Sequence, residues 1–173
     1  MKVLVAYASR HGATAEIAGR IGDVLGSAGL AVDVLPVDRV RDLAPYRAVV
    51  LGSAVYIGLW RKGAAAFLKQ NEQRLAGMPV WLFSSGPMGQ GDPLTLTEGW
   101  RLPTALRPIV ERIRPRDIAV FGGVADLRKL NLFEKWIMKK VQAPSGDFRD
   151  WNAITAWAAA IGSALTEGVA EAQ

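Results

Sequence analysis

Short apolar runs and stretches of helical spacing alternate along this chain. Five runs are short and rich in β-branched or aromatic residues, as expected for strands. Residues 30–37 alternate apolar with polar positions and include Pro36, which indicates an edge strand. The other runs are almost continuously apolar, which is typical of strands covered on both faces. The predicted strands are residues 2–8, 30–37, 48–54, 80–84 and 118–122.

Between these runs, apolar residues recur every three or four positions, which predicts helices. In the first helix, which begins at Ala13, Ile17, Ile21 and Leu25 share one face, and Gly26 ends it. Further helices are predicted over residues 64–75, over residues 106–113, and after Asp150, which can cap the last helix.

Alternating strands and helices favour an α/β fold, in which helices cover both faces of a parallel sheet. The edge-like second strand and the buried first, third and fourth strands fit the order 2-1-3-4-5. Right-handed crossovers then place ligands beyond the carboxyl ends of strands one, three and four. We predict one three-layer α/β/α domain over residues 1–173, with a five-stranded parallel sheet and a helical insert after strand five, at about residues 124–149.

Composition narrows the class of protein. Hydrophobic residues make up 50% of the chain and charged residues 21%, so the chain can form a core and is unlike a disordered protein. Cysteine is absent, which excludes disulfides, thiolate metal sites and iron–sulfur clusters and suits a reducing compartment. No signal peptide or apolar stretch of spanning length is recognisable. We therefore expect a cytoplasmic protein.

The net charge of +5 favours anionic partners, such as carboxylate-bearing substrates or acidic lipid. Nucleic acid is not expected, because Lys and Arg are dispersed and no binding motif for it is present. No metal site is predicted either. One histidine, with no cysteine and no nucleophile elbow, argues against hydrolytic catalysis.

The first strand is followed by the loop Ser9-Arg10-His11-Gly12-Ala13-Thr14 and then by a helix. Small residues there let backbone N–H groups surround a phosphate at the helix N-terminus, and hydroxyls or Arg10 can assist. The loop lacks the Lys of a Walker loop and the glycines of dinucleotide sites, so a monophosphate is favoured. An ordinary turn capped by Thr14 fits equally well. For His11 we favour a solvent-facing position, and the alternatives are that it binds the phosphate or exchanges a proton near the ligand.

Two more loops, residues 52–60 and 84–91, fall at the same edge of the predicted sheet. Tyr56 and Trp60 in the first loop are candidates for stacking on a planar ligand, and packing against the following helix is the alternative that we favour for Trp60. The second loop contains no aromatic residue. Its Gly86 and Gly89 allow close backbone approach to a ligand or simply form turns.

The pattern Ser-x-x-Gly-x-Thr after the first strand resembles the phosphate loop of flavodoxins, usually Thr-x-Thr-Gly-x-Thr, with His11 replacing a threonine. The other two loops fall where that family binds the flavin ring. The resemblance implies a flavodoxin-like fold with non-covalently bound FMN, one face of which is open because an aromatic residue is missing after strand four. The residues expected at FMN are Ser9, Arg10, His11, Gly12, Ala13, Thr14, Ser53, Ala54, Val55, Tyr56, Ile57, Gly58, Ser85, Gly86, Pro87, Met88 and Gly89.

Nearly the whole chain is similar to one branch of that family, the bacterial menaquinone-dependent protoporphyrinogen oxidases, which carry an extra segment after the fifth strand. This resemblance implies an oxidoreductase of haem biosynthesis that passes hydrogens from protoporphyrinogen IX through FMN to a quinone. No residue stands out as a catalytic acid or base. The resemblance is carried by residues 9–12, 52–56, 121–123, 133–140 and 146–151.

Three alternatives to this enzyme remain open. An electron-transfer flavodoxin would serve a reductase or another redox protein. A related reductase would use a deazaflavin or a quinone in the same cleft. A flavin-free interaction domain would keep the fold alone.

The insert contains a basic amphipathic segment, Arg128 to Val141. Its apolar stripe consists of Leu130, Phe133, Ile137 and Val141, widened by Trp136 and Met138. Its basic residues are Arg128, Lys129, Lys135, Lys139 and Lys140, offset by Glu134. Such a helix can lie at the surface of an anionic membrane, which would place the protein at the inner face of the cell membrane. Packing of the stripe on the domain beside the cleft is the alternative, and we favour it slightly.

Overall fold

The computed structural model describes residues 1–86, 89–126, 128–140 and 144–170. Five parallel strands form the central sheet in the order β2-β1-β3-β5-β6, which confirms the predicted order. Each predicted strand is present, with ends shifted by no more than two residues. The strands are β1 (Lys2–Ala8), β2 (Ala31–Pro36), β3 (Ala48–Tyr56), β5 (Val80–Ser85) and β6 (Asp117–Phe121).

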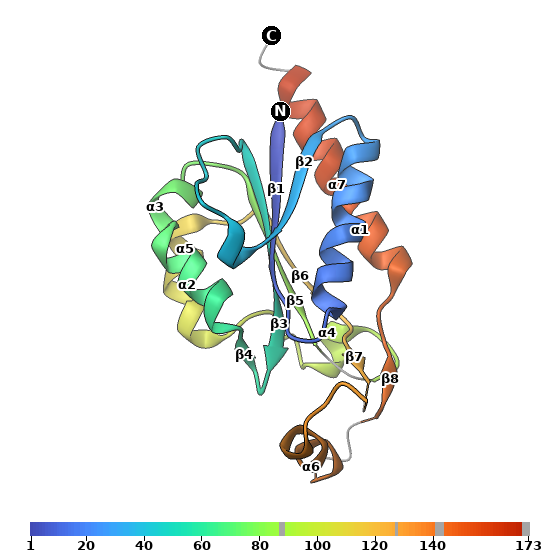
Figure 1. The fold of residues 1–173 in the computed structure, drawn as a ribbon. Helices are drawn as coiled ribbons and strands as arrows, with labels where there is room; N and C mark the ends of the chain where they lie inside the picture. The colour runs from blue at the N-terminus through green and yellow to red at the C-terminus, as the bar shows by residue number, and fades with distance from the viewer. Residues whose placement is uncertain (87–88, 127, 141–143, 171–173) are drawn as a thin grey trace.

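Helices cover both faces of the sheet (Figure 1). One face carries α1 (Ala13–Ser27) and α7 (Trp151–Ala170), which lie side by side. The other face carries α2 (Lys62–Gln70), α3 (Glu72–Leu75) and α5 (Arg107–Ile113). Shorter turns complete this chain path, namely η1 (Val37–Arg39), α4 (Pro93–Leu96) and η2 (Thr104–Leu106).

Alternation along the strands divides the core into two layers. In β1, Val3 and Val5 pack toward α1 and α7, whereas Leu4 and Ala6 pack toward the opposite helices. All four are fully buried, because successive side chains of a strand point to opposite faces and both faces of this sheet are covered. The apolar runs of the sequence predict such strands for this reason.

Three features differ from the predicted elements. The helix expected over residues 64–75 is divided into α2 and α3 at Asn71, whose side-chain amide donates to the Phe67 carbonyl. The strand β4 (Leu59–Trp60) pairs antiparallel with the end of β3. Pro103 and Pro108 flank the start of the next helix, which begins as a 3₁₀ turn before α5.

The insert lies beyond the carboxyl ends of the strands, at the bottom of Figure 1. It contains β7 (Val124–Ala125), α6 (Leu132–Lys140) and β8 (Gly146–Asp147), and the two short strands pair antiparallel. Gly122 allows this packing, because a Cβ there would lie 2.0 Å from the Phe148 carbonyl oxygen. None of the helices in the described residues has the length and apolar character needed to span a membrane.

Candidate functional site

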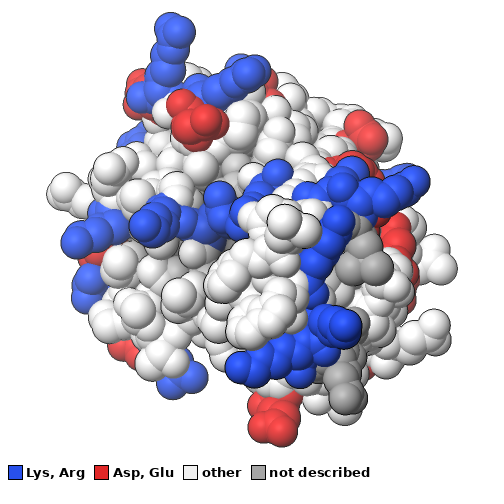
Figure 2. Space-filling view, turned by 60° about the horizontal axis from the view of Figure 1, so that its bottom comes forward, with Lys and Arg blue, Asp and Glu red and all other residues white. Residues whose placement is uncertain are grey.

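A cavity of about 180 Å³ lies where the loops after β1, β3 and β5 meet the insert. Lys and Arg side chains cross the face of the molecule that carries this end of the sheet, and acidic side chains lie toward its edges (Figure 2). The cavity is lined by Ser9, Arg10, His11, Ala13, Thr14, Ala54, Val55, Tyr56, Ile57, Ser85, Gly86, Gly123, Val124, Ala125, Leu130, Glu134, Ile137 and Met138.

The loop after β1 leads directly into α1. Gly12 has a φ of 96°, a left-handed conformation that favours glycine, and its N–H donates to Ser9 Oγ at 3.1 Å. The N-cap of α1 is Gly12, and no side chain among the described residues caps the helix, so the interpretation of this loop as a turn capped by Thr14 is wrong. The first-turn N–H groups, which belong to Ala13 and its neighbours at the cavity wall, are therefore left for another acceptor. That arrangement suits an anion.

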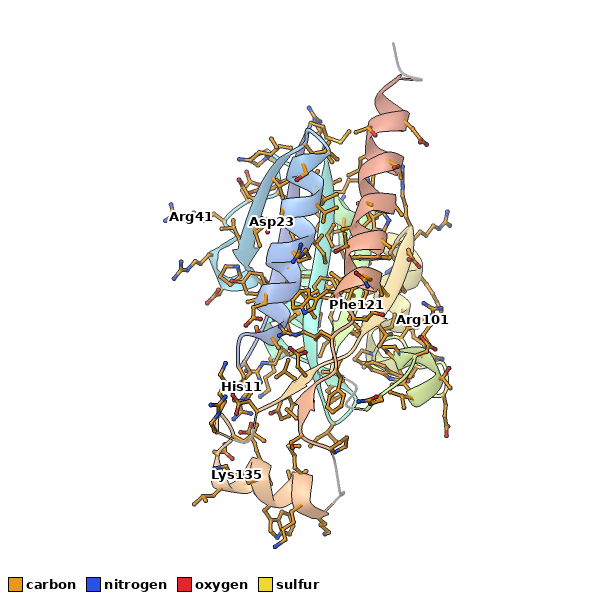
Figure 3. All side chains as sticks on the ribbon, turned by 90° about the vertical axis from the view of Figure 1, so that its right-hand side faces the viewer. His11, Asp23, Arg41, Arg101, Phe121 and Lys135 are labelled. Carbon is orange, nitrogen blue, oxygen red and sulfur yellow. The ribbon has the colours of Figure 1, made fainter. Side chains whose placement is uncertain are left out.

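A buried carboxylate from the insert sits beside this loop. Glu134 of α6 is 6% exposed and accepts from the Tyr56 hydroxyl at 3.0 Å and from Arg10 at 2.7 Å. The Nε2 atom of His11 lies 3.6 Å from the same carboxylate oxygen, Oε1. The other oxygen accepts from the Asn131 N–H at 2.9 Å, while Asn131 caps α6 in return. Figure 3 shows His11 beside α6 at this junction.

Titration in this cluster favours an ionised Glu134 and a neutral Tyr56. Burial by itself raises the pKa of Glu134, but hydrogen bonds from Asn131 and Tyr56 and the charges of Arg10 and His11 together lower it. Burial, and then the hydrogen bond to Glu134, raise the pKa of Tyr56. The Tyr56 hydroxyl therefore keeps its proton at neutral pH and donates a hydrogen bond to the carboxylate.

Two more basic residues tie the insert to the loop after β1. Lys129 Nζ lies 3.3 Å from the backbone oxygen of His11. Arg149, which follows β8 and has an 8% exposed side chain, bonds Glu16 of α1 at 2.7 Å and approaches the Ala13 carbonyl at 3.5 Å. The insert thus contacts the loop after β1 through Lys129 and the first turn of α1 through Arg149.

Some residues of the loop after β3 line the cavity and others do not. Tyr56 lines the cavity, and the Arg10 guanidinium lies 5.3 Å from the centre of its ring. Trp60 is buried away from the cavity, where its Nε1 donates to Ser84 Oγ at 2.8 Å, which confirms the packing interpretation for this residue. Ser53 does not line the cavity either, because its hydroxyl accepts from the Arg61 N–H and donates to its neighbour's carbonyl. Gly58 lies at the exposed tip of the hairpin.

The loop after β5 brings Ser85 and Gly86 to the cavity. Gly86 packs tightly, because a Cβ there would lie 3.1 Å from Val55, and a Cβ on Gly123 would lie 2.9 Å from Gly86. Gly89 packs beside the Leu96 side chain instead of lining the cavity. The expected residues Pro87 and Met88 lie outside the described residues.

Most of the loop residues expected at FMN thus line one cavity, but residues of the insert, which were expected only to pack beside the cleft, line it as well. His11 is 27% exposed and lines the cavity, so it faces both the candidate site and solvent. Glu134 carried a detectable signal, since Asn131 three residues earlier forms a capping box with it. The residues of the insert region at the cavity are Gly123, Val124, Ala125, Leu130, Glu134, Ile137 and Met138.

The amphipathic stripe of the insert is divided between two directions. Leu130, Ile137 and Met138 face the cavity, whereas Phe133 and Trp136 are 66% and 55% exposed. The packing interpretation therefore holds for one part of the stripe and fails for the other. Val141 lies outside the described residues.

Comparison with known proteins gives a consistent result. Residues 4–152 match the family model described as Flavodoxin domain. Protoporphyrinogen IX dehydrogenase (quinone) of Escherichia coli K12 is 25% identical over 152 residues, which cover 87% of this chain and 83% of that protein.

Solved structures show the same fold. Rubredoxin oxygen:oxidoreductase from Desulfovibrio gigas matches with a TM-score of 0.65 at 14% identity, covering 98% of this chain and 37% of that chain. A point mutant of a Pseudomonas aeruginosa flavodoxin matches with a TM-score of 0.57 at 16% identity, covering 96% of this chain and 99% of that chain. The fold is therefore flavodoxin-like.

Proposed function

We propose that this chain, which belongs to the flavodoxin domain family, is an FMN-dependent oxidoreductase that acts on a porphyrinogen-like substrate and a quinone. The observation that carries the proposal is the start of α1. Its first turn has no side-chain cap and borders a cavity that the loops after β3 and β5 complete. Bound FMN would supply the redox chemistry by accepting hydrogens from one molecule and giving them to another.

The phosphate end of FMN would bind at the loop from Ser9 to Thr14. The N–H groups of the α1 first turn would donate to it, and the helix dipole would favour its charge. Arg10 contributes less than its charge suggests, since Glu134 already pairs with it at 2.7 Å. We assign Arg10 the role of holding Tyr56, over whose ring it lies.

The ring end of FMN would lie among apolar walls at the loops after β3 and β5. Ala54, Val55 and Tyr56 line one side of the cavity, and Gly86 and Gly123 belong to the loops packed against it. Ile137 and Met138 of α6 add further apolar side chains to these walls. Apolar walls with few polar groups are typical of cofactor sites.

The substrate class rests on charge and on the Escherichia coli relative. A porphyrinogen carries propionate carboxylates, which suit the basic side chains on the cleft-bearing face (Figure 2). The relative is named for protoporphyrinogen IX and quinone and is 25% identical over most of both chains. Both observations support the same reaction for this chain.

The experiment is an anaerobic assay of the FMN-loaded protein with protoporphyrinogen IX and menaquinone. We expect turnover well above the rate with an equal concentration of free FMN. Titration of the apoprotein with FMN and with riboflavin tests the cofactor separately. Much tighter FMN binding is expected, and equal affinities would refute the phosphate site. If FMN binds but turnover matches free FMN, a one-electron carrier replaces the enzyme.

A further inference from the structure

The outer side of α6 carries large apolar side chains that the fold leaves in water. Leu132, Phe133 and Trp136 are 86%, 66% and 55% exposed. The rings of Phe133 and Trp136 stack with their centroids 6.1 Å apart. Isolated exposed apolar residues are ordinary, but a group on one short helix marks an interaction surface.

A second apolar projection lies beside this helix. The turn between β3 and β4 exposes Ile57 by 83% and Leu59 by 60%. Ile57 borders the same cavity as Glu134 and Ile137 of α6. In Figure 1 the β3–β4 turn and α6 both lie at the bottom of the molecule. The five exposed residues Ile57, Leu59, Leu132, Phe133 and Trp136 are called the apolar rim below.

The exposed charged residues of α6 are all lysines. Lys135, Lys139 and Lys140 are exposed on α6, and none of them forms a salt bridge within the described part of the chain. Lys140 Nζ lies 5.0 Å from the centre of the Trp136 ring. The acidic residue of the helix, Glu134, is turned inward and buried. Aromatic residues flanked by lysines suit the headgroup region of an anionic bilayer.

We propose that the apolar rim and the three lysines dock the protein on the surface of an anionic membrane. The apolar side chains enter the headgroup region, and the lysines stay beside the lipid phosphates. Charge complementarity selects lipid over a second copy of this chain, because two copies would bring six lysines together. Since Ile57 of the apolar rim also lines the cavity, docking would bring this edge of the cavity to the membrane. If the proposed function holds, the quinone would reach FMN from the bilayer.

The test is sedimentation of the full chain with vesicles of phosphatidylcholine, with or without phosphatidylglycerol. We expect binding only with phosphatidylglycerol and weaker binding as salt is raised. Changing Lys135, Lys139 and Lys140 to Glu should weaken binding by at least about a hundredfold, since each charge contributes about fivefold. Changing Phe133 and Trp136 to Ser should weaken it by at least about tenfold.

A matched control changes Arg41, Lys69 and Arg74 to Glu, three exposed residues away from α6 that alter net charge equally. This control should bind vesicles nearly as the wild type does. If both triple variants lose binding equally, the loss reflects net charge alone and the proposed docking surface is wrong. Absence of binding at low salt would also overturn it. So would light scattering that shows a dimer dissociated by the Phe133 and Trp136 changes. Sedimentation involves no substrate, so its outcome is independent of the enzyme assay.

Discussion

Replacing Glu134 with Ala removes the contacts that join α6 to the loops of the cleft. The carboxylate accepts from Tyr56 and Arg10 on the domain side and from the Asn131 N–H at the start of α6. Glu134 is nearly fully buried, so these bonds are protected from water. We therefore expect the substitution to release α6 from the cleft while the sheet remains intact.

The size of the effect follows from the individual contacts. The Tyr56 hydrogen bond and the capping bond of Asn131 are each worth about 1 kcal/mol. The Arg10 side chain is 36% exposed, so its ion pair adds only about 0.5 kcal/mol. Together these contributions come to about 2.5 kcal/mol, which corresponds to a shift of between tenfold and a hundredfold in the opening equilibrium. Glu134→Gln keeps an acceptor for Tyr56 and the capping box, so about a twofold shift is expected.

Hydrogen exchange of the α6 backbone amides measures this opening directly. Protection of residues 132–140 should fall in Glu134→Ala by the factor given above and scarcely change in Glu134→Gln. Glu111→Ala, which changes an exposed glutamate on α5, serves as the matched control. If α6 exchanges equally fast in Glu134→Ala and in this control, the carboxylate does not hold the helix and the reasoning is refuted.

The same contact predicts a pH dependence of known sign. Because the pKa of Glu134 is lowered in the folded protein, its ionised form stabilises the docked α6 at pH values above the ordinary glutamate pKa. This stabilisation is lost as pH falls from the ordinary glutamate pKa through the lowered value. After correction for intrinsic exchange rates, wild-type α6 should lose protection in that range and Glu134→Gln should not. If both proteins lose protection equally, a titratable group other than Glu134 causes the loss.

Three further predictions concern the loops around the cavity. Gly12→Ala should weaken FMN binding by roughly 1 kcal/mol in a titration, because the φ of 96° is strained for alanine. A Cβ at this position meets no protein atom, so the cost comes from the backbone alone, and Gly12→Asn should cost less. Gly123→Ala should lower the free energy of unfolding in urea by about 1–3 kcal/mol, since its Cβ would lie 2.9 Å from Gly86, whereas Gly19→Ala, in open space on α1, should raise it slightly. Arg149→Lys should lower the melting temperature and the FMN affinity together, because lysine cannot bond two carboxylates as the buried guanidinium does. If both values are unchanged, Arg149 does not hold α1 in place.

Sequence patterns predicted the sheet well for a physical reason. Strands covered on both faces are uniformly apolar, so β1, β3, β5 and β6 were recognisable, and the alternating β2 identified an edge. Their order then placed three loops at one edge, because parallel strands all end there. The short strands β4, β7 and β8 have two residues each, which is too few for any period to appear.

The parts of the site that the sequence did not predict depend on long-range contacts. Arg149 and Glu16 are 133 residues apart, and nothing local indicates that they meet. The division at Asn71 is equally invisible, because Leu68 and Leu75 keep helical spacing across it. Gly122 and Gly123 were recognised through resemblance, and their physical reason is the close approach of Phe148 and Gly86.

The direction of α6 shows most clearly what a pattern leaves open. Periodicity reports that apolar residues share a stripe, but a stripe about 100° wide is compatible with a core, a membrane or both. Here the buried glutamate resolves the direction. A carboxylate among lysines suggests a solvated face, yet Glu134 is held inward by Tyr56 and Arg10. Once that residue faces the cavity, helical geometry turns Phe133 and Trp136 outward, where both are exposed. The ionic contact of Glu134 thus helps to orient both the side of α6 that lines the cleft and the side that we propose to dock on a membrane.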